Sequence, residues 1–253
     1  MKDKEVALKK SWRIQYHLYR SFWAGVDLLY PPLCGGCAKK GIRWCEDCRK
    51  NIRLIPEPKC EICGLPHPKA GICPNCKQKR PSYQALLSWA IFEGPIRKAL
   101  HRIKYKQDLG LGDALVADFL PYFNQLNWKI DLIVPVPLGK KRFRERGYNQ
   151  VGLFALPLAL ASGWKYAPRV LKRARETISQ VGLSADERKN NVRDAFIADR
   201  RGVAEKTVLV VDDVSTTGAT LNSCAEALIR GGAKNVYAFS IARALPHHGL
   251  QIV

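Results

Sequence analysis

The chain has 253 residues, enough for one domain of moderate size and a small additional module. It carries a formal net charge of +20, and 47% of its residues are hydrophobic, an ordinary share for a globular protein. No run of about 18 apolar residues occurs, so we expect no membrane-spanning helix. The first residues mix acids and bases without an apolar core, which argues against a secretion signal. We therefore expect a cytoplasmic protein.

Residues 1–30 are predicted to form an amphipathic helix that ends before Pro31 and Pro32. Two apolar rows lie side by side on this helix. The first row is Trp12, Tyr16, Tyr19, Trp23 and Val26, and the second is Ile14, Leu18 and Phe22. A basic and aromatic helix of this kind either docks on a membrane surface or a partner, or packs on its own protein. Packing on its own protein is the commoner case.

Eight of the nine cysteines form four Cys-x-x-Cys pairs within residues 31–80. Each pair supplies two thiolates at one edge of a tetrahedron, so two pairs complete a four-thiolate zinc site. Joining neighbouring pairs gives a double zinc ribbon with two structural Zn²⁺ ions, while crossed pairing and disulfides are the alternatives. The predicted ligands are Cys34, Cys37, Cys45 and Cys48 for one ion, and Cys60, Cys63, Cys73 and Cys76 for the other.

From residue 81 to 243, within a predicted domain of residues 81–253, apolar strands alternate with helical patterns. This alternation predicts an α/β fold, a parallel sheet with helices on both faces, preceded by the small zinc-ribbon module. The predicted strands are 86–92, 131–134, a short one at Leu171, and 236–241. The predicted helices are 96–105, 113–126 and one that starts near Asn149 with Leu153, Leu156 and Leu160 facing inward.

Two basic clusters interrupt this pattern. One is the polar face of the helix at 96–105, and the other is a loop at 140–146 with five bases after a predicted strand. Each cluster either binds a polyanion or is a solvated surface. The candidate nucleic-acid-binding residues are Lys104, Lys106, Lys140 and Arg144.

The most informative stretch is VLVVDDVSTTGAT, residues 208–220. Its four leading apolar residues predict a strand buried on both faces that ends at Asp212. A hydroxyl-rich turn and a helix at 219–230 follow. Free N–H groups and the dipole at a helix N-terminus favour a phosphate, whereas two carboxylates accept hydrogen bonds from a vicinal diol. We therefore predict a ribose 5-phosphate site, the alternative being a solvated strand end and an ordinary helix cap.

The residues assigned to this site divide into two groups. The ribose would be bound by Asp212 and Asp213. The 5′-phosphate would be bound by Ser215, Thr216, Thr217, Gly218, Ala219 and Thr220.

The stretch resembles the 5-phosphoribosyl-1-pyrophosphate (PRPP) motif of type I phosphoribosyltransferases. With the preceding cysteine pairs, VPVPLGKKRFRERGYNQ and TISQVGLSADERKNNV, the chain from about Leu29 to Arg243 is similar to the ComF (ComFC) competence proteins, which include GntX-like proteins. The resemblance implies a fold that binds PRPP with Mg²⁺ and acts in DNA uptake. Single-stranded DNA and a helicase-like ATPase are the implied partners. The resemblance assigns Val136, Pro137, Lys141, Arg142 and Arg146 to a pyrophosphate loop, and Thr177, Gln180 and Arg188 to a flexible loop over PRPP.

Two function classes follow from this resemblance. In the first, the protein handles single-stranded DNA and PRPP is a ligand. In the second, it is a phosphoribosyltransferase that moves phosphoribosyl from PRPP to an amine or a base. The zinc module stands where a transferase would place a hood over the nucleophile, so the sequence leaves transfer itself open.

Overall fold

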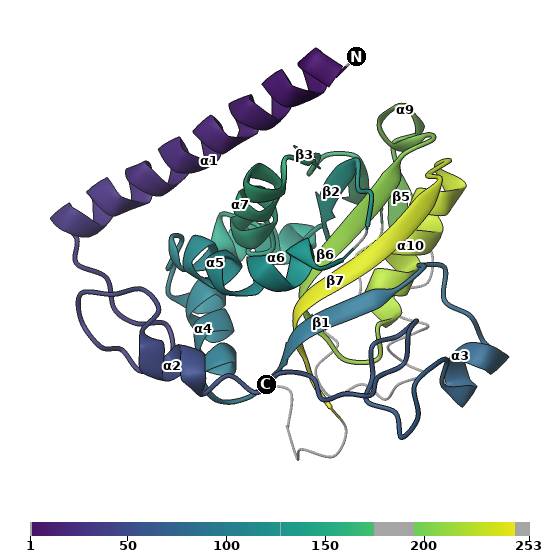
Figure 1. Cartoon of the computed structure of the whole chain (residues 1–253), viewed down its shortest axis with the longest axis horizontal. Coiled ribbons are helices and arrows are strands. Elements are labelled where there is room, and N and C mark those ends of the chain that lie inside the picture. The colour runs from purple at the N-terminus through teal and green to yellow at the C-terminus, as the bar shows by residue number, and fades with distance from the viewer. Residues whose placement is uncertain (1, 127, 175–194, 246–253) are drawn as a thin grey trace.

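A five-stranded sheet forms the centre of the molecule (Figure 1). The structure, a computed structural model, describes residues 2–126, 128–174 and 195–245. The strands of the sheet are β1 (Leu86–Ile91), β2 (Leu132–Pro135), β3 (Lys165–Tyr166), β6 (Thr207–Ser215) and β7 (Asn235–Arg243). They are all parallel, in the order β1-β7-β6-β2-β3, which confirms the predicted parallel sheet.

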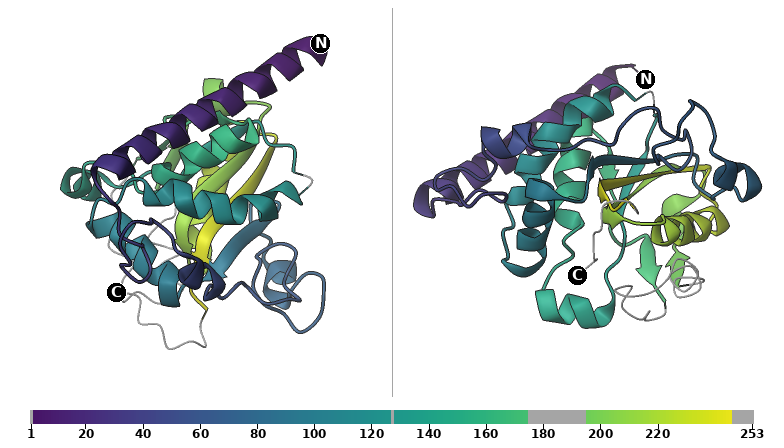
Figure 2. Two further views of the ribbon diagram at one scale, coloured as in Figure 1. Left: turned by 60° about the vertical axis from the view of Figure 1, so that its left-hand side comes forward. Right: turned by 90° about the horizontal axis from the view of Figure 1, so that it is seen from below.

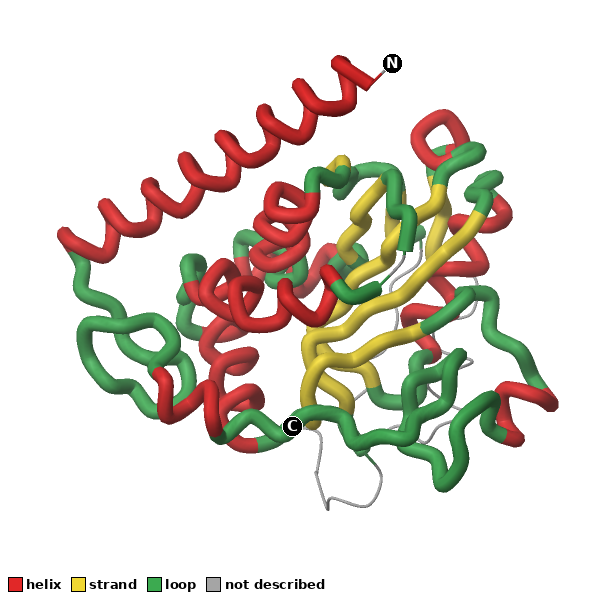
Figure 3. The backbone as a smooth tube through the Cα atoms, in the orientation of Figure 1, coloured by secondary structure: helices red, strands yellow, loops and turns green. Residues whose placement is uncertain are grey.

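Helices cover both faces of the sheet (Figure 3). Because side chains alternate along a strand, Leu209 and Phe239 face one apolar cluster, while Val208 and Val210 face another. The first cluster is covered by α4 (Gly94–Tyr105), α5 (Leu111–Asn124) and α7 (Gly152–Ser162). The second is covered by α10 (Ala219–Arg230), α9 (Arg200–Val203) and the antiparallel pair β4 (Leu171–Arg173) and β5 (Phe196–Ala198).

Two ribbons of the same design precede the sheet. An antiparallel bridge closes the first knuckle of each ribbon, Leu33 with Lys40 and Lys59 with Pro66. A five-residue helix then follows the third cysteine of each ribbon, and these helices are α2 (Glu46–Lys50) and α3 (Pro74–Gln78). The first ribbon shares the apolar cluster of α4 and α5, and the second shares that of α10. The ribbons thus pack against opposite faces of the sheet, and α2 and α3 lie well apart in Figures 1 and 2.

The N-terminal helix α1 (Lys2–Leu29) lies along α7, outside the other helices (Figure 2). Its row from Trp12 to Val26 is half-buried, which agrees with packing on its own protein. The second row remains on the surface, with exposed fractions of 53% for Ile14, 65% for Leu18 and 62% for Phe22. Within the described residues, no helix has both the length and the apolar character that crossing a membrane requires.

Two expectations about the segments near the site are wrong. Residues 140–146 form a helix, α6 (Lys140–Arg146), and not a loop, because lysine, arginine and glutamate favour helix and Gly147, at φ +79°, ends it. Strand β6 does not end at Asp212. It continues to Ser215, since β7 is long enough to pair Arg243 with that residue.

Two further expectations fail away from the site. The strand at Leu171 is present, but it pairs only with β5 and stays outside the main sheet. On α7, the predicted inward row Leu153, Leu156 and Leu160 is only half-buried. The side chains that are fully buried are Phe154, Ala155, Leu158 and Ala159. The helix itself carries apolar side chains on all sides, so the periodicity of the sequence could not identify its inward face.

Helices α5 and α7 approach closely at Gly112, where a Cβ atom would lie 2.3 Å from the carbonyl oxygen of Leu153. We expect Gly112→Ala to lower the free energy of unfolding by about 1–3 kcal/mol through overpacking, measured by urea denaturation. Gly25→Ala, in α1 with open space around it, should instead raise stability by roughly 0.5–1 kcal/mol. Equal stability of Gly112→Ala and the natural protein would contradict the close helix contact.

Candidate functional site

The turn between β6 and α10 presents unpaired hydrogen-bond donors. In the part of the chain that the structure describes, no group accepts from the backbone N–H of Thr216, Thr217 or Gly218. Gly218 has φ +83°, and a Cβ atom there would lie 3.2 Å from Tyr83 Oη, so the turn requires glycine. The first N–H groups of α10 begin directly after it. These donors and the helix dipole make the turn an anion-binding feature.

Ser215 adds a buried hydroxyl to this turn. Its Oγ is buried and has no hydrogen-bond partner among the described residues. The N–H of Ala219, by contrast, already donates to Thr217 Oγ1 at 3.3 Å. The turn therefore keeps most of its polar atoms available for a ligand.

The two acids at the end of β6 are held in different ways. Asp213 is buried, 6% exposed, and its Oδ2 lies 2.7 Å from Lys104 Nζ and 3.4 Å from Gln150 Nε2. Asp212 is half-buried, and its Oδ1 accepts from the N–H of Asp213 at 2.9 Å. The sequence pattern predicts Lys104 on the exposed basic face of α4. The structure corrects this prediction, because the Lys104 ammonium group faces the acid pair.

The electrostatics of the pair follow from this arrangement. Burial and the neighbouring Asp213 carboxylate raise the pKa of Asp212 well above its ordinary value. Burial acts in the same direction on Asp213, but the Lys104 ammonium, together with hydrogen bonds from Asp212 and the Val214 N–H, outweighs it and holds the pKa of Asp213 below its ordinary value. Asp213 is therefore the ionised member, and Asp212 takes up a proton more readily.

The end of β2 and the basic helix α6 reach the same edge of the sheet. The N–H of Val136 donates to the Val211 carbonyl at 2.8 Å, which places the predicted pyrophosphate loop beside β6. Arg146 Nη1 donates to Gln150 Oε1 at 2.8 Å, and Gln150 in turn contacts Asp213. The two stretches singled out in the sequence, 135–146 and 212–220, are thus connected by side chains.

The remaining assigned residues of this edge are distributed as follows. Pro137 is half-buried, and Lys140, Lys141, Arg142 and Arg144 are exposed on α6. Thr177, Gln180 and Arg188 lie outside the described residues. Sequence reasoning missed Gln150, and the signal for it was a polar Gly-Tyr-Asn-Gln stretch between a basic segment and an apolar one.

Each cysteine tetrad has the shape of a zinc site. Within each tetrad the four Sγ atoms lie within 4.8 Å of one another, and the tetrads combine neighbouring Cys-x-x-Cys pairs as predicted. In the first, Cys34 Sγ lies 3.6 Å from the Sγ atoms of Cys45 and Cys48. A tetrahedral zinc–sulfur bond of about 2.3 Å requires sulfur–sulfur distances of about 3.8 Å. The residues therefore fit structural zinc, which would tie each ribbon together.

Backbone groups support both tetrads in the same way. The Cys45 N–H donates to Cys34 Sγ at 3.4 Å, and the Cys73 N–H donates to Cys60 Sγ at 3.3 Å. Such bonds stabilise a thiolate. Crossed pairing of the knuckles is excluded by this geometry, because each tetrad closes within its own ribbon.

The second tetrad is connected to the strand edge by Arg243. This residue ends β7 opposite Ser215 and has no exposed surface. Its Nη1 donates to the carbonyl oxygen of Cys63 at 3.1 Å. A zinc ion with four thiolates carries a net charge of about −2, which would offset a buried guanidinium. The ribbon therefore adjoins the turn that begins at Ser215.

Comparisons with known proteins agree with this architecture. The chain matches the family described as double zinc ribbon domain over residues 25–77, and the family described as phosphoribosyl transferase domain over residues 119–245. It is therefore a protein of the phosphoribosyltransferase fold with an N-terminal double zinc ribbon.

The curated relatives make the assignment more specific. The chain is 31% identical to DNA utilization protein YhgH of Salmonella typhi, over 92% of this chain and 96% of that protein. It is 31% identical to Competence protein F of Haemophilus influenzae, over 82% and 92%, and 27% identical to Competence protein ComFC of Bacillus subtilis, over 87% and 97%. The chain belongs to the ComF family of competence proteins, as the resemblance predicted.

The assignment of the cysteine tetrads as zinc ligands can be tested by measuring the zinc content of variants. We expect Cys45→Ser to reduce bound zinc from two ions to about one per chain, because three thiolates and a hydroxyl bind zinc weakly. It should also lower the Tm, since Cys45 packs in the cluster of α4 and α5. Cys224→Ala, which alters the buried cysteine outside both tetrads, should keep both ions. Two zinc ions in Cys45→Ser would contradict the ligand assignment.

Proposed function

We propose that this protein binds PRPP with Mg²⁺ at the carboxyl edge of its sheet and acts with single-stranded DNA in natural competence. One observation carries the first part. The N–H donors of Thr216, Thr217 and Gly218, which have no acceptor among the described residues, lie a few residues from a carboxylate pair in the same strand–turn–helix unit. Donors suit a phosphate and carboxylates suit a diol, so the unit matches the two ends of a phosphorylated ribose.

Each group of site residues binds a different part of PRPP. The ribose hydroxyls donate to Asp212 and Asp213. The 5′-phosphate accepts from the turn, by way of Ser215, Thr216, Thr217, Gly218, Ala219 and Thr220. The pyrophosphate lies toward Val136, Pro137, Lys141, Arg142 and Arg146, where positive charge and a divalent ion offset its own charge.

The DNA role has independent support from charge and from the names of the relatives. The chain has a net charge of +20, and the exposed bases of α6 lie beside the site. One relative is named for DNA utilization and two are named for competence. A basic surface of this kind attracts nucleic acid mainly through its phosphates. A helicase-like ATPase is the further partner that this role implies.

Isothermal calorimetry with PRPP and Mg²⁺ tests the ligand. We expect Asp212→Asn with Asp213→Asn to weaken PRPP binding at least a hundredfold, because the charged acceptor at Asp213 is lost and an amide replaces each carboxyl group that would accept from the ribose. Asp131→Asn is the matched control, since Asp131 accepts from the Thr207 N–H at the opposite end of β6. Zinc content and Tm should stay close to those of the natural protein in the control.

The same measurement separates the alternatives. Unchanged PRPP affinity in the double variant would refute the site. Release of pyrophosphate from PRPP on addition of an amine or a base would assign the protein to the transferases instead.

Fluorescence anisotropy with a labelled single-stranded oligonucleotide tests the DNA role. We expect the affinity to fall steeply with salt concentration. Replacing the exposed residues Lys106 and Arg144 by glutamine should reduce the salt slope by about 0.7 for each lost phosphate contact. Affinity that does not depend on salt, or no binding at low salt, would contradict this role.

A further inference from the structure

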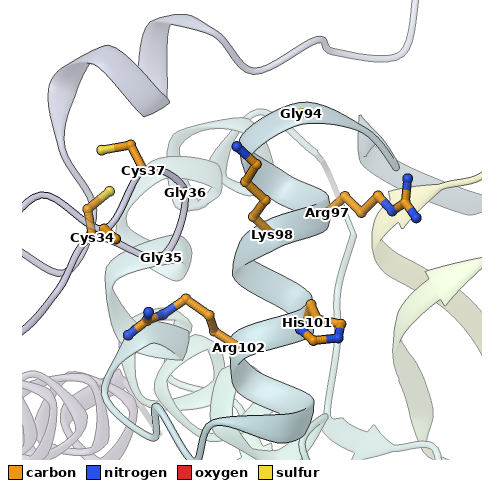
Figure 4. A pocket seen from close by; sticks show the side chains of 10 residues that line it. Cys34, Gly35, Gly36, Cys37, Gly94, Arg97, Lys98, His101 and Arg102 are labelled. Atoms are coloured by element: carbon orange, nitrogen blue, oxygen red, sulfur yellow. The ribbon is translucent and has the colours of Figure 1, made fainter. Parts of the chain in front are cut away.

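A groove between α4 and the first ribbon lies outside the proposed PRPP site (Figure 4). It encloses about 580 Å³. One wall is the first knuckle, residues 34–38, and the other is the basic face of α4 from Gly94 to Arg102. In Figure 4, Lys98 and Arg102 extend from the helix toward the ribbon, and Arg97 and His101 extend to the other side.

Two of the cations that line the groove have no acidic partner among the described residues. Arg102 is paired with Asp108 at 3.0 Å. Arg97 and Lys98 are exposed, and no carboxylate within the described ranges pairs with either of them. Unpaired charges of one sign along one wall of a groove raise the local concentration of anions. The groove therefore favours a ligand with repeated negative charges.

The basic face leads along α4 to the proposed PRPP site. Arg97, His101 and Lys104 are spaced i, i+4 and i+7, which places them in one row of the helix. The last member of this row, Lys104, contacts Asp213. A polyanion bound along the row would thus lie with one end close to the acid pair.

An exposed aromatic ring lies beside the same row. Tyr105, at the end of α4, is 58% exposed. Its ring centroid lies 4.6 Å from that of His101, and the Arg146 guanidinium of α6 lies 5.1 Å from the ring. An exposed ring beside an arginine guanidinium is a stacking platform of the kind that accepts an unpaired nucleic-acid base.

We propose that the α4 groove and the adjoining C-terminal end of α4 form the binding surface for single-stranded nucleic acid. Arg97, Lys98 and His101 contact the backbone, and Tyr105, at the end of the helix, stacks on a base. This inference rests on the proposed DNA role, and it adds the surface and the mode of binding. Stacking on Tyr105 requires an unpaired base, because a duplex hides the faces of its bases. The surface is therefore selective for single strands over duplex.

The test compares variants of the full chain by anisotropy with a labelled oligothymidylate. We expect Tyr105→Ala to weaken binding about tenfold, Tyr105→Phe to retain binding, and Tyr105→Ala to have no effect on an abasic oligonucleotide. Arg97→Gln with Lys98→Gln should lower the salt slope by about 1.4. Zinc content and Tm verify that each variant is folded.

Matched controls remove the same groups elsewhere. Tyr30→Ala removes another exposed tyrosine, at the end of α1, and Lys206→Gln with Lys234→Gln removes two charges at the opposite end of the sheet. Neither control should change the oligonucleotide affinity or its salt slope as the groove variants do. If the natural protein binds the oligonucleotide and the groove variants behave like the controls, the groove is refuted and the DNA role stands. If the natural protein does not bind it, both are refuted, while PRPP binding is judged separately.

Discussion

The parallel pairing of β6 with β2 on one side and β7 on the other is the constraint on which the site depends. Parallel strands end at the same edge, so whatever follows β2, β6 and β7 must meet there. The basic helix α6 follows β2, the donor-rich turn follows β6, and Arg243 ends β7. Residues more than 100 positions apart in sequence, such as Lys104 and Asp213, are thus brought into one site.

The Lys104–Asp213 ion pair fixes the helix α4 relative to this edge. Desolvating two charges is unfavourable, and a pair of this kind is retained where geometry is good and other bonds satisfy the carboxylate. Here Gln150 and the Val214 N–H supply those bonds. Because the same helix carries the groove residues, the proposed ligand on α4 and the proposed ligand at the acid pair would both act on this helix. That shared element is a physical route by which one ligand would change the affinity for the other.

The sequence revealed the parts of this structure that depend on local pattern. Four consecutive apolar residues at 208–211 predict a buried central strand, and the helix at 219–230 has the predicted bounds. The cysteine spacing predicts both tetrads, because two thiolates three residues apart fit one edge of a tetrahedron. What periodicity could not reveal was the inward face of α7, where α1 covers the outer side and every position from 153 to 161 is apolar.

The charge pattern of a helix likewise does not reveal which of its basic residues form ion pairs, and α4 shows this most clearly. Arg97 and Lys104 belong to one helical row, and both are basic residues on the polar face. One is exposed without an acidic partner among the described residues, and the other is directed into an acid pair more than 100 residues away. Nothing in the helix distinguishes them, because the difference lies in β6, whose Asp213 pairs with Lys104. A basic helix can thus bind a polyanion along its length and also position a carboxylate at its end. Only the tertiary contacts show which of these roles each basic residue has.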